Sequence, residues 1–305
     1  TSEELGALAR GMLAKAETID LDVHAVDIVG TGGDQQNTVN ISTMAALVIA
    51  GTGATVVKHG NRASTSKSGS ADVLEALGIQ LDMPIKSVAA CARQVGITFL
   101  FAMTFHPSMR FVGPTRKMLG IPTAFNYLGP MTNPARVSSS AIGVANPQMV
   151  EKMAWVFANR GDHALVFRGD DGLDELTIAT TSQIWEASGG TLQKYVFNPE
   201  GYGIERSSLD NLRGGDAEYN ASVFRAVLAG EGESAKDSLH AIRNAVLINA
   251  AAGLIAYRKN DGRSFEERYT EALADARQSI DTGAAAQVLN AWVEFSHLVV
   301  ETPSP

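Results

Sequence analysis

The sequence predicts an α/β fold whose central sheet is mostly parallel. Three observations support this prediction. Short β-like runs alternate with helical stretches, two of these runs end in glycine-containing polar loops, and helical patterns dominate after Asn220. The chain has 305 residues, 45% of them hydrophobic, so it can bury a full core as one large domain or two unequal domains.

The first predicted element is a helix, because apolar residues recur at helical spacing from Thr1 to Ala16 and Thr1 can form a capping box with Glu4. A strand, a glycine loop and an alanine-rich helix then follow one another, and a similar order of strand, loop and helix occurs again from Thr55 to Leu77. In chain order we predict a strand at 25–29, a helix from about Ser42, a strand at 55–57, a helix that Ser70 caps and that ends at Leu77 before Gly78, a helix at 84–95 and a strand at 97–101.

A long segment punctuated by proline and glycine, residues 106–134, follows these elements. It is too long for a tight turn, so we expect it to hold short helices and to lie over a binding site. Beyond it we predict a strand at 141–144, a helix at 147–160 and a strand at 164–167 that ends in an acidic loop.

Charge and hydropathy limit the possible partners. The net charge of -8 argues against a protein that wraps nucleic acid. The longest apolar stretches, 44–57 and 245–257, fall short of the roughly 18 residues that a membrane helix needs. We therefore expect neither a nucleic-acid nor a membrane partner.

Basic residues gather in two places along the chain, and this pattern fits a small, highly charged anionic ligand. The two clusters are Lys58, Arg62 and Lys67, and Arg110, Arg116 and Lys117.

Cysteine usage and the start of the chain bear on the compartment. The single Cys91 cannot form an internal disulfide, and no secretory signal pattern opens the sequence. We expect a cytoplasmic protein.

The first motif is the loop Gly30–Asp34, which follows a strand and leads into a helix. Glycines let backbone amides approach an anion, and a helix N-terminus adds unpaired N–H groups, so this architecture suits a phosphate. The same residues could form an ordinary turn with Ser42 as a helix cap. Gln35 leaves the dinucleotide fingerprint G-x-G-x-x-G incomplete, and the sequence contains no P-loop motif.

The second motif is the polar segment Lys58–Ser70, in which cationic side chains and hydroxyls surround two glycines. Such a set of donors suits a pyrophosphate. A polar surface loop is the alternative, and we disfavour it because like charges at this density would repel one another unless an anion lay among them.

The third motif is the acidic run Asp170–Glu175, directly after a strand. Carboxylates placed there are suited to Mg²⁺, which takes one or two protein carboxylates together with substrate phosphates. The alternatives are a solvated acidic turn and a glycosidase-like acid and base, although sequence neighbours rarely flank one bond. Calcium-loop, zinc-hydrolase and serine-hydrolase patterns are absent from the sequence.

These motifs, together with three further segments, resemble the bacterial anthranilate phosphoribosyltransferases of tryptophan biosynthesis. The resemblance extends from about Thr1 to Phe295, and the motifs agree in order and spacing as well as in composition. The further segments are Phe105–Pro107, Arg116–Gly120 and Phe125–Pro134.

The resemblance implies a small helical domain joined to a larger α/β domain, a homodimer formed through the helical domain, and catalysis in the cleft between the two. By this likeness, residues 1–22 form the helical domain, joined by helices from about 104–125, and residues 23–103 and 126–305 form the α/β domain. Family chains usually begin with additional helices, so we expect this helical domain to lack the first of them.

The resemblance also implies roles for individual residues. Lys58, Asp174 and Glu175 would be catalytic, and Ser42, Asp174 and Glu175 would bind Mg²⁺. Anthranilate would contact Gly30, Asn61, His106 and Arg116. Phosphoribosyl pyrophosphate would contact Gly30, Gly33, Asp34, Thr38, Asn40, Ile41, Ser42, Thr43, Lys58, His59, Gly60, Asn61, Arg62, Ala63, Ser64, Thr65, Ser66 and Ser70, with Thr65 standing where the family has serine.

The reaction so implied transfers the phosphoribosyl group of phosphoribosyl pyrophosphate to the amine of anthranilate, with Mg²⁺ as cofactor. Two alternatives stay open. Pyrimidine nucleoside phosphorylases share the architecture and a related glycine loop, but the Arg116 region suits a carboxylated aromatic. A non-enzymatic relative that binds nucleic acid would need a basic face and a degraded metal pair, whereas this chain is acidic and keeps Asp174 and Glu175.

Overall fold

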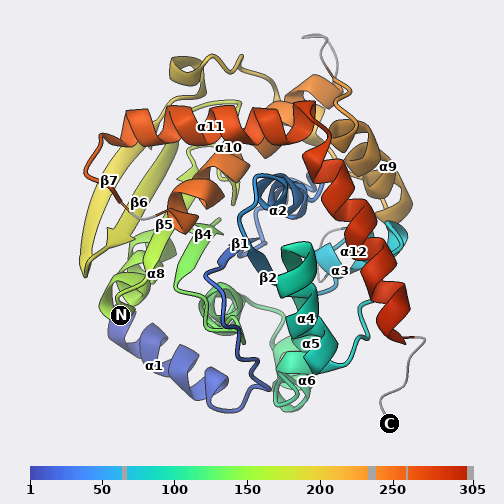
Figure 1. Cartoon of the computed structure of the whole chain (residues 1–305). Helices are drawn as coiled ribbons and strands as arrows, with labels where there is room; N and C mark the ends of the chain where they lie inside the picture. Colours follow the sequence, from blue (N-terminus) through green and yellow to red (C-terminus); the bar gives the residue numbers. More distant parts are fainter. Residues whose placement is uncertain (64–66, 233–237, 259, 301–305) are drawn as a thin grey trace.

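A seven-stranded sheet runs through the protein in the order β3-β2-β1-β4-β5-β6-β7 (Figure 1). The computed structural model describes residues 1–63, 67–232, 238–258 and 260–300. The first five strands are parallel and the last two are antiparallel, which confirms the predicted mostly parallel α/β sheet. The strands are β1 (Val26–Gly30), β2 (Val56–Gly60), β3 (Ile97–Phe101), β4 (Ser139–Gly143), β5 (His163–Gly169), β6 (Ser182–Ser188) and β7 (Thr191–Phe197).

Helices cover both faces of this sheet. They are α1 (Ser2–Leu13), α2 (Ile41–Gly51), α3 (Ser70–Ala76), α4 (Ile85–Val95), α5 (Ala102–Phe105), α6 (Met109–Leu119), α7 (Phe125–Leu128), α8 (Pro147–Arg160), α9 (Ala217–Leu228), α10 (Ser238–Tyr257), α11 (Phe265–Asp281) and α12 (Ala284–Val300), with the short 3₁₀ helices η1 (Gly129–Met131), η2 (Pro199–Tyr202) and η3 (Leu209–Leu212).

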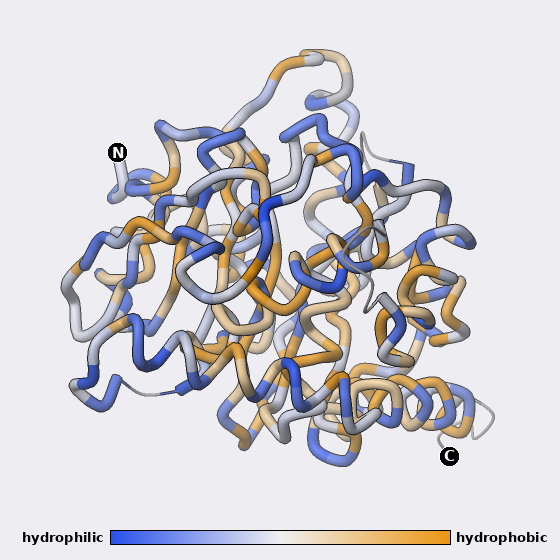
Figure 2. The backbone as a smooth tube through the Cα atoms, turned by 90° about the horizontal axis from the view of Figure 1, so that it is seen from above, coloured by the Kyte–Doolittle hydropathy of each residue, from blue (hydrophilic) through white to orange (hydrophobic). Residues whose placement is uncertain are grey.

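Alternate residues of the central strands face two separate cores. Ala141 and Leu165 belong to the larger core beneath α2, α10, α11 and α12, whereas Ile142 and Val166 belong to a smaller one beneath α8 and α1. This alternation is the period-2 pattern of a sheet covered on both sides. Hydrophobic segments run through the middle of the molecule, and many of the outer turns are hydrophilic (Figure 2).

Helix α10 lies against α2 and α11. It begins at Ser238, well before the apolar stretch at 245–257, and its 20 residues are long and apolar enough to span a membrane by length and composition. However, 83% of its most apolar window is buried inside the protein. Gly253 permits the close packing, because a Cβ there would lie 2.3 Å from Ile49 Cδ1. Helix α10 is therefore a buried core helix of the protein.

Most predicted elements occur within a few residues of the expected bounds. The Thr1–Glu4 capping box is confirmed, with Glu4 N donating to Thr1 Oγ1 at 3.2 Å. The long segment at 106–134 holds α6, α7 and η1, as expected. The prediction that Ser70 caps α3 was wrong, because Gly69 is the N-cap and Ser70 is the first helical residue. The antiparallel β6–β7 hairpin was not predicted.

Candidate active site

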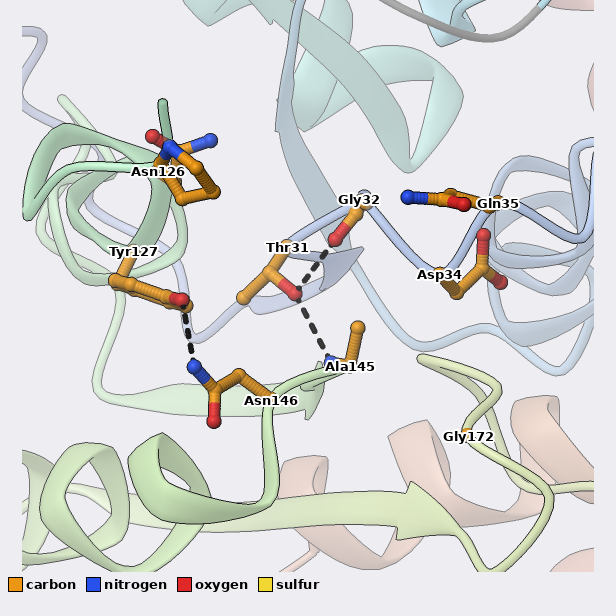
Figure 3. Close-up of a pocket in the computed structure, with 11 residues that line it drawn as sticks. Thr31, Gly32, Asp34, Gln35, Asn126, Tyr127, Ala145, Asn146 and Gly172 are labelled. Carbon is orange, nitrogen blue, oxygen red and sulfur yellow. Dashed lines mark hydrogen bonds between the residues drawn. The ribbon is translucent and has the colours of Figure 1, made fainter. Parts of the chain in front are cut away.

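A cavity of about 330 Å³ lies where β1 and β4 end (Figure 3). From β1 the sheet grows in one direction through β2 and β3, and the chain then returns to add β4 on the other side of β1. The strand order therefore reverses between β1 and β4. Ligands of open α/β sheets bind in such crevices, outside the carboxyl ends of the strands. The cavity is lined by Thr31, Gly32, Gly33, Asp34, Gln35, Pro122, Asn126, Tyr127, Ala145, Asn146 and Gly172.

The glycine loop after β1 forms one wall of this cavity. Gly32 and Gly33 have positive φ angles of 68° and 86°, and Gln35 is also left-handed at 62°. Thr31 Oγ1 accepts a hydrogen bond from Ala145 N at 3.2 Å, which ties the loop to the segment after β4. Glycines in this conformation let backbone amides come close to an anion, and Gly33 and Asp34 line the cavity.

Helix α2 follows the loop, and its N-cap is Asn40 rather than Ser42. The Asn40 side chain does not cap the helix. Its amide donates to Ser68 O at 3.0 Å and its oxygen accepts from Asn220 at 2.9 Å, so it ties the start of α2 to the second polar segment. The prediction, within the alternative of an ordinary turn, that Ser42 caps the helix is therefore wrong.

The acidic loop packs directly against the ends of β1 and β4. Gly32 N donates to Asp174 Oδ2 at 2.6 Å. Two glycines make room for this approach, because a Cβ at Gly30 would lie 2.2 Å from Asp174 Oδ2 and a Cβ at Gly143 would lie 1.7 Å from the Asp174 carbonyl oxygen. The sequence thus brings Asp174 to the glycine loop from a strand two places along the sheet.

Asp174 and Glu175 are nearly buried, with 9% and 7% of their surface exposed. Burial, together with the nearby charge of Asp34, raises the pKa of Asp174 to about 7. Burial and Asp174 also raise the pKa of Glu175, against the opposing effect of Lys58. Carboxylates crowded in this way favour a bound cation.

Asp174 and Glu175 also suit the coordination chemistry of magnesium. Among the described residues, no group of three or more His, Cys, Asp or Glu side chains is arranged to hold a metal. Mg²⁺ does not need such a cage, because it binds one or two carboxylates and completes its shell with waters and phosphates. Asp170 and Asp171 are occupied elsewhere: Asp170 accepts from Thr181 and Gln183, and Asp171 from Leu173 N and Thr177.

Lys58 lies in β2 and is completely buried. Its Nζ donates to the Ile28 carbonyl and to Ser42 Oγ, the latter at 3.3 Å. Burial lowers the pKa of Lys58, whereas the charges of Asp27 and Glu175 raise it. The structure thus brings Lys58 together with Ser42 and Glu175.

The remainder of the second polar segment is held mainly by helix α3. Arg62 pairs with Asp72 at 3.0 Å and with Glu75. Its charge is therefore balanced within the chain, and the expectation that only an anion could relieve the repulsion was wrong for this residue. Ala63 N and Gly69 N both donate to Asp72 Oδ2, at 3.0 and 2.8 Å, which closes the base of the loop. Ser64, Thr65 and Ser66 lie outside the described residues.

His59 and His106 form a buried pair, with ring centroids 5.0 Å apart, and neither lines the cavity. His59 Nδ1 lies 3.0 Å from Gly129 O, and His106 Nε2 lies 3.1 Å from Thr132 O. The other ring nitrogens, His59 Nε2 and His106 Nδ1, have no hydrogen-bond partner among the described residues. Burial lowers the pKa of His59 to about 3, with a further contribution from His106, so both rings are neutral near pH 7.

Arg116 lies on α6, half-buried, with its guanidinium 5.7 Å from the Phe125 ring centroid. Neither Arg116 nor His106 is among the residues that line the cavity. The predicted site residues did not include Tyr127 and Asn146, which line the cavity and whose side chains form a hydrogen bond of 3.0 Å (Figure 3). The position of Asn146, just after a predicted strand that neighbours the glycine loop, is the signal that could have identified it.

Comparison with known proteins agrees with this geometry. A family model described as the glycosyl transferase family, a/b domain, matches residues 22–286. The anthranilate phosphoribosyltransferase of Arthrobacter sp. (strain FB24) is 55% identical over 97% of this chain and 82% of its own length.

Solved structures give the same result. The anthranilate phosphoribosyltransferase of Thermus thermophilus superimposes with a TM-score of 0.88 at 39% identity, covering 97% of this chain and 85% of that one. The Saccharomyces cerevisiae enzyme, solved in complex with PRPP and Mg, gives a TM-score of 0.87 at 30% identity and covers 97% of this chain and 80% of that one.

Proposed function

The chain belongs to the anthranilate phosphoribosyltransferases, within the glycosyl transferase family with an a/b domain, and on that premise we propose how its residues share the reaction. The enzyme transfers the phosphoribosyl group of phosphoribosyl pyrophosphate to the amine of anthranilate, giving N-(5-phosphoribosyl)anthranilate and pyrophosphate. One observation carries the assignment of roles: the buried Asp174–Glu175 pair faces the glycine loop where β1 and β4 end.

We propose that Asp174, Glu175 and Ser42 hold Mg²⁺. Magnesium bound there would offset the negative charge that develops on the departing pyrophosphate. The Ser42 backbone lies near enough to Glu175 to lower the pKa of that carboxyl, and the Ser42 hydroxyl lies beside Lys58, so carboxylate, hydroxyl and ammonium groups come close together. The yeast relative solved with PRPP and Mg supports this proposal.

The phosphoribosyl pyrophosphate site combines the remaining donors. The proposed contacts are Gly30, Gly33, Asp34 and Thr38, the first turn of α2 from Asn40 to Thr43, and residues 58–66 with Ser70. Lys58 and the loop amides stabilise the charge on pyrophosphate as its bond to the ribose anomeric carbon breaks, and such preorganised donors contribute roughly 3 to 4 kcal/mol each in favourable cases.

Anthranilate attacks the anomeric carbon from the opposite side, so the configuration inverts. Its aromatic amine is neutral near pH 7 and presents its lone pair, and after the nitrogen–carbon bond forms the surplus proton passes to solvent. Little base catalysis is therefore required. We propose that Arg116 binds the anthranilate carboxylate and that Gly30, Asn61 and His106 complete the contacts to the substrate.

We further propose a cytoplasmic homodimer that associates through the helical domain, residues 1–22 with helices from about 104–125. Exposed apolar side chains on α5, α6 and the segment after them support a contact there: Met103, Phe111, Met118 and Ile121 are 65% or more exposed. Sedimentation equilibrium at micromolar concentration tests the dimer, and a monomer would refute it.

The metal assignment is tested by Asp174→Asn and Glu175→Gln, with Asp170→Asn as the matched control. Each of the first two should raise the magnesium concentration for half-maximal activity by at least about 10-fold and depress kcat, while the anthranilate KM stays near wild type. Asp170 accepts its hydrogen bonds from partly exposed side chains, Thr181 before β6 and Gln183 on β6, so its variant should behave as wild type. Wild-type magnesium dependence in both test variants would show that the assignment is wrong.

A further inference from the structure

The pairing between β1 and β2 stops near the start of both strands. Among the described residues, these two strands are in register only at Val26 and Val56, whereas β1 pairs with β4, and β2 with β3, along their whole lengths. A continued parallel ladder would join Ile28 N to Val57 O and His59 N to Ile28 O. Buried backbone groups of this kind need partners.

Three buried side chains take the place of those ladder partners, and we call them the polar seam: Asp27, Lys58 and Asn133. Asp27 and Lys58 have no exposed surface and Asn133 is 6% exposed. Their contacts are Asn133 Nδ2 to the Val57 carbonyl at 2.8 Å, His59 N to Asp27 Oδ1 at 3.1 Å, and Lys58 Nζ to the Ile28 carbonyl.

The seam is also bonded within itself. Asn133 Nδ2 donates to Asp27 Oδ2 at 2.8 Å, and Asn133 Oδ1 accepts from Ala135 N at 2.9 Å. Both oxygens of the Asp27 carboxylate are therefore satisfied, and the positive charge of Lys58 acts on it directly. A buried charge destabilises a protein strongly unless it is paired with an opposite charge and its hydrogen bonds are satisfied, as they are for Asp27.

The opened seam has a geometric consequence for the active site. Where a continuous ladder would bring β1 and β2 together, the Lys58 side chain crosses to β1 and its Nζ reaches Ser42 Oγ at 3.3 Å. Asp27 and Asn133 do not line the cavity. They can affect the reaction only through the groups that they hold.

We propose that Asp27 and Asn133 are positioning residues, which keep β1 and β2 apart so that Lys58 can place its ammonium group at the phosphate loop. The inference rests on the proposed function, because it deepens the role given there to Lys58. Loss of either residue should let the ladder close or the seam collapse, and Lys58 would then lose its position without any change to the metal pair or to the anthranilate contacts.

Kinetics of four forms of the full chain test this: wild type, Asp27→Asn, Lys58→Met and the double variant. Asp27→Asn should lower kcat by about 10- to 100-fold while the anthranilate KM stays within about twofold. In the Lys58→Met background the same substitution should lower kcat by less than about threefold, because the group that it positions is gone.

A wild-type kcat in Asp27→Asn, or an equal loss in both backgrounds, would overturn the inference. If Asp27→Asn does not fold, Asn133→Ala takes its place. It removes the hydrogen bonds from Asn133 to Asp27 and to the Val57 carbonyl without a change of charge, and kcat is measured for it with and without Lys58→Met. Glu186→Gln is the control, because it replaces another buried carboxylate far along the sheet and should keep kcat. Absence of transfer by the wild type would overturn the proposed function and this inference together, whereas normal wild-type transfer leaves the proposed function standing.

Discussion

Gly143→Ala should disable the enzyme without removing any functional group. The added Cβ would lie 1.7 Å from the Asp174 carbonyl oxygen and 2.5 Å from its carbonyl carbon. An ordinary carbon–oxygen contact is about 3.3 Å, so the acidic loop would have to move by roughly 1.6 Å. Since a misplacement of 1 Å can cost about 100-fold in rate, we expect kcat/KM for phosphoribosyl pyrophosphate to fall at least 100-fold.

The assay is anthranilate consumption followed by fluorescence, with thermal melting followed by circular dichroism. Gly11→Ala is the control, because Gly11 lies within α1 and a Cβ there would meet nothing within 4 Å. That variant should keep its activity and gain roughly 0.5 to 1 kcal/mol of stability from the lost backbone freedom. A folded Gly143→Ala enzyme with wild-type kcat/KM would refute the claim that this glycine positions the metal pair.

Two other predictions concern substrate binding and stability. Arg116→Ala should raise the anthranilate KM by about 10- to 100-fold and leave the phosphoribosyl pyrophosphate KM nearly unchanged, since hydrogen bonds to charged groups contribute about 1.5 to 3 kcal/mol; equal changes in both KM values would refute the assignment. Burial raises the pKa of Glu186, but hydrogen bonds from Arg268 and His163 outweigh burial and lower it to about 2. The stability from this carboxylate is therefore complete above the unfolded pKa near 4.5 and is lost as the pH falls toward 2. Urea unfolding from pH 7 to pH 3 should show a shallower decline for Glu186→Gln than for wild type, and parallel curves would contradict this.

The parallel core of the fold could be predicted because each of its elements carries a local signal. Alternation of apolar runs with helical patterns identified β1 to β5, and capping chemistry identified α1 at Thr1. The β6–β7 hairpin was missed although its two-residue turn, Gly189 and Gly190, is a local hairpin signal. Strand β7 is largely exposed and its sequence is mostly polar, so the apolar pattern on which the other strands were predicted is weak there.

The site could be predicted only where consecutive residues carry the chemistry. The glycine loop, Lys58 and the Asp174–Glu175 pair each stand out in the sequence, and the fold brings them together. Partners that come from distant elements could not be foreseen.

Arg62 is balanced by Asp72 and Glu75 from the next helix, which sequence density alone does not reveal. Asp27 is a single polar residue within an apolar strand, and Asn133 is bonded to it from a distant segment. The polar seam depends on a break in the ladder between two strands, and no local pattern encodes such a break.

The measurement that tests the central claim most directly is the loss of anthranilate fluorescence when phosphoribosyl pyrophosphate and magnesium are added to the purified chain, with EDTA in a parallel sample. We predict a rapid loss that requires magnesium and that EDTA abolishes. No loss from a chain shown by circular dichroism to be folded, or a loss that EDTA leaves unchanged, would contradict a metal-assisted transfer at the end of β1 and β4.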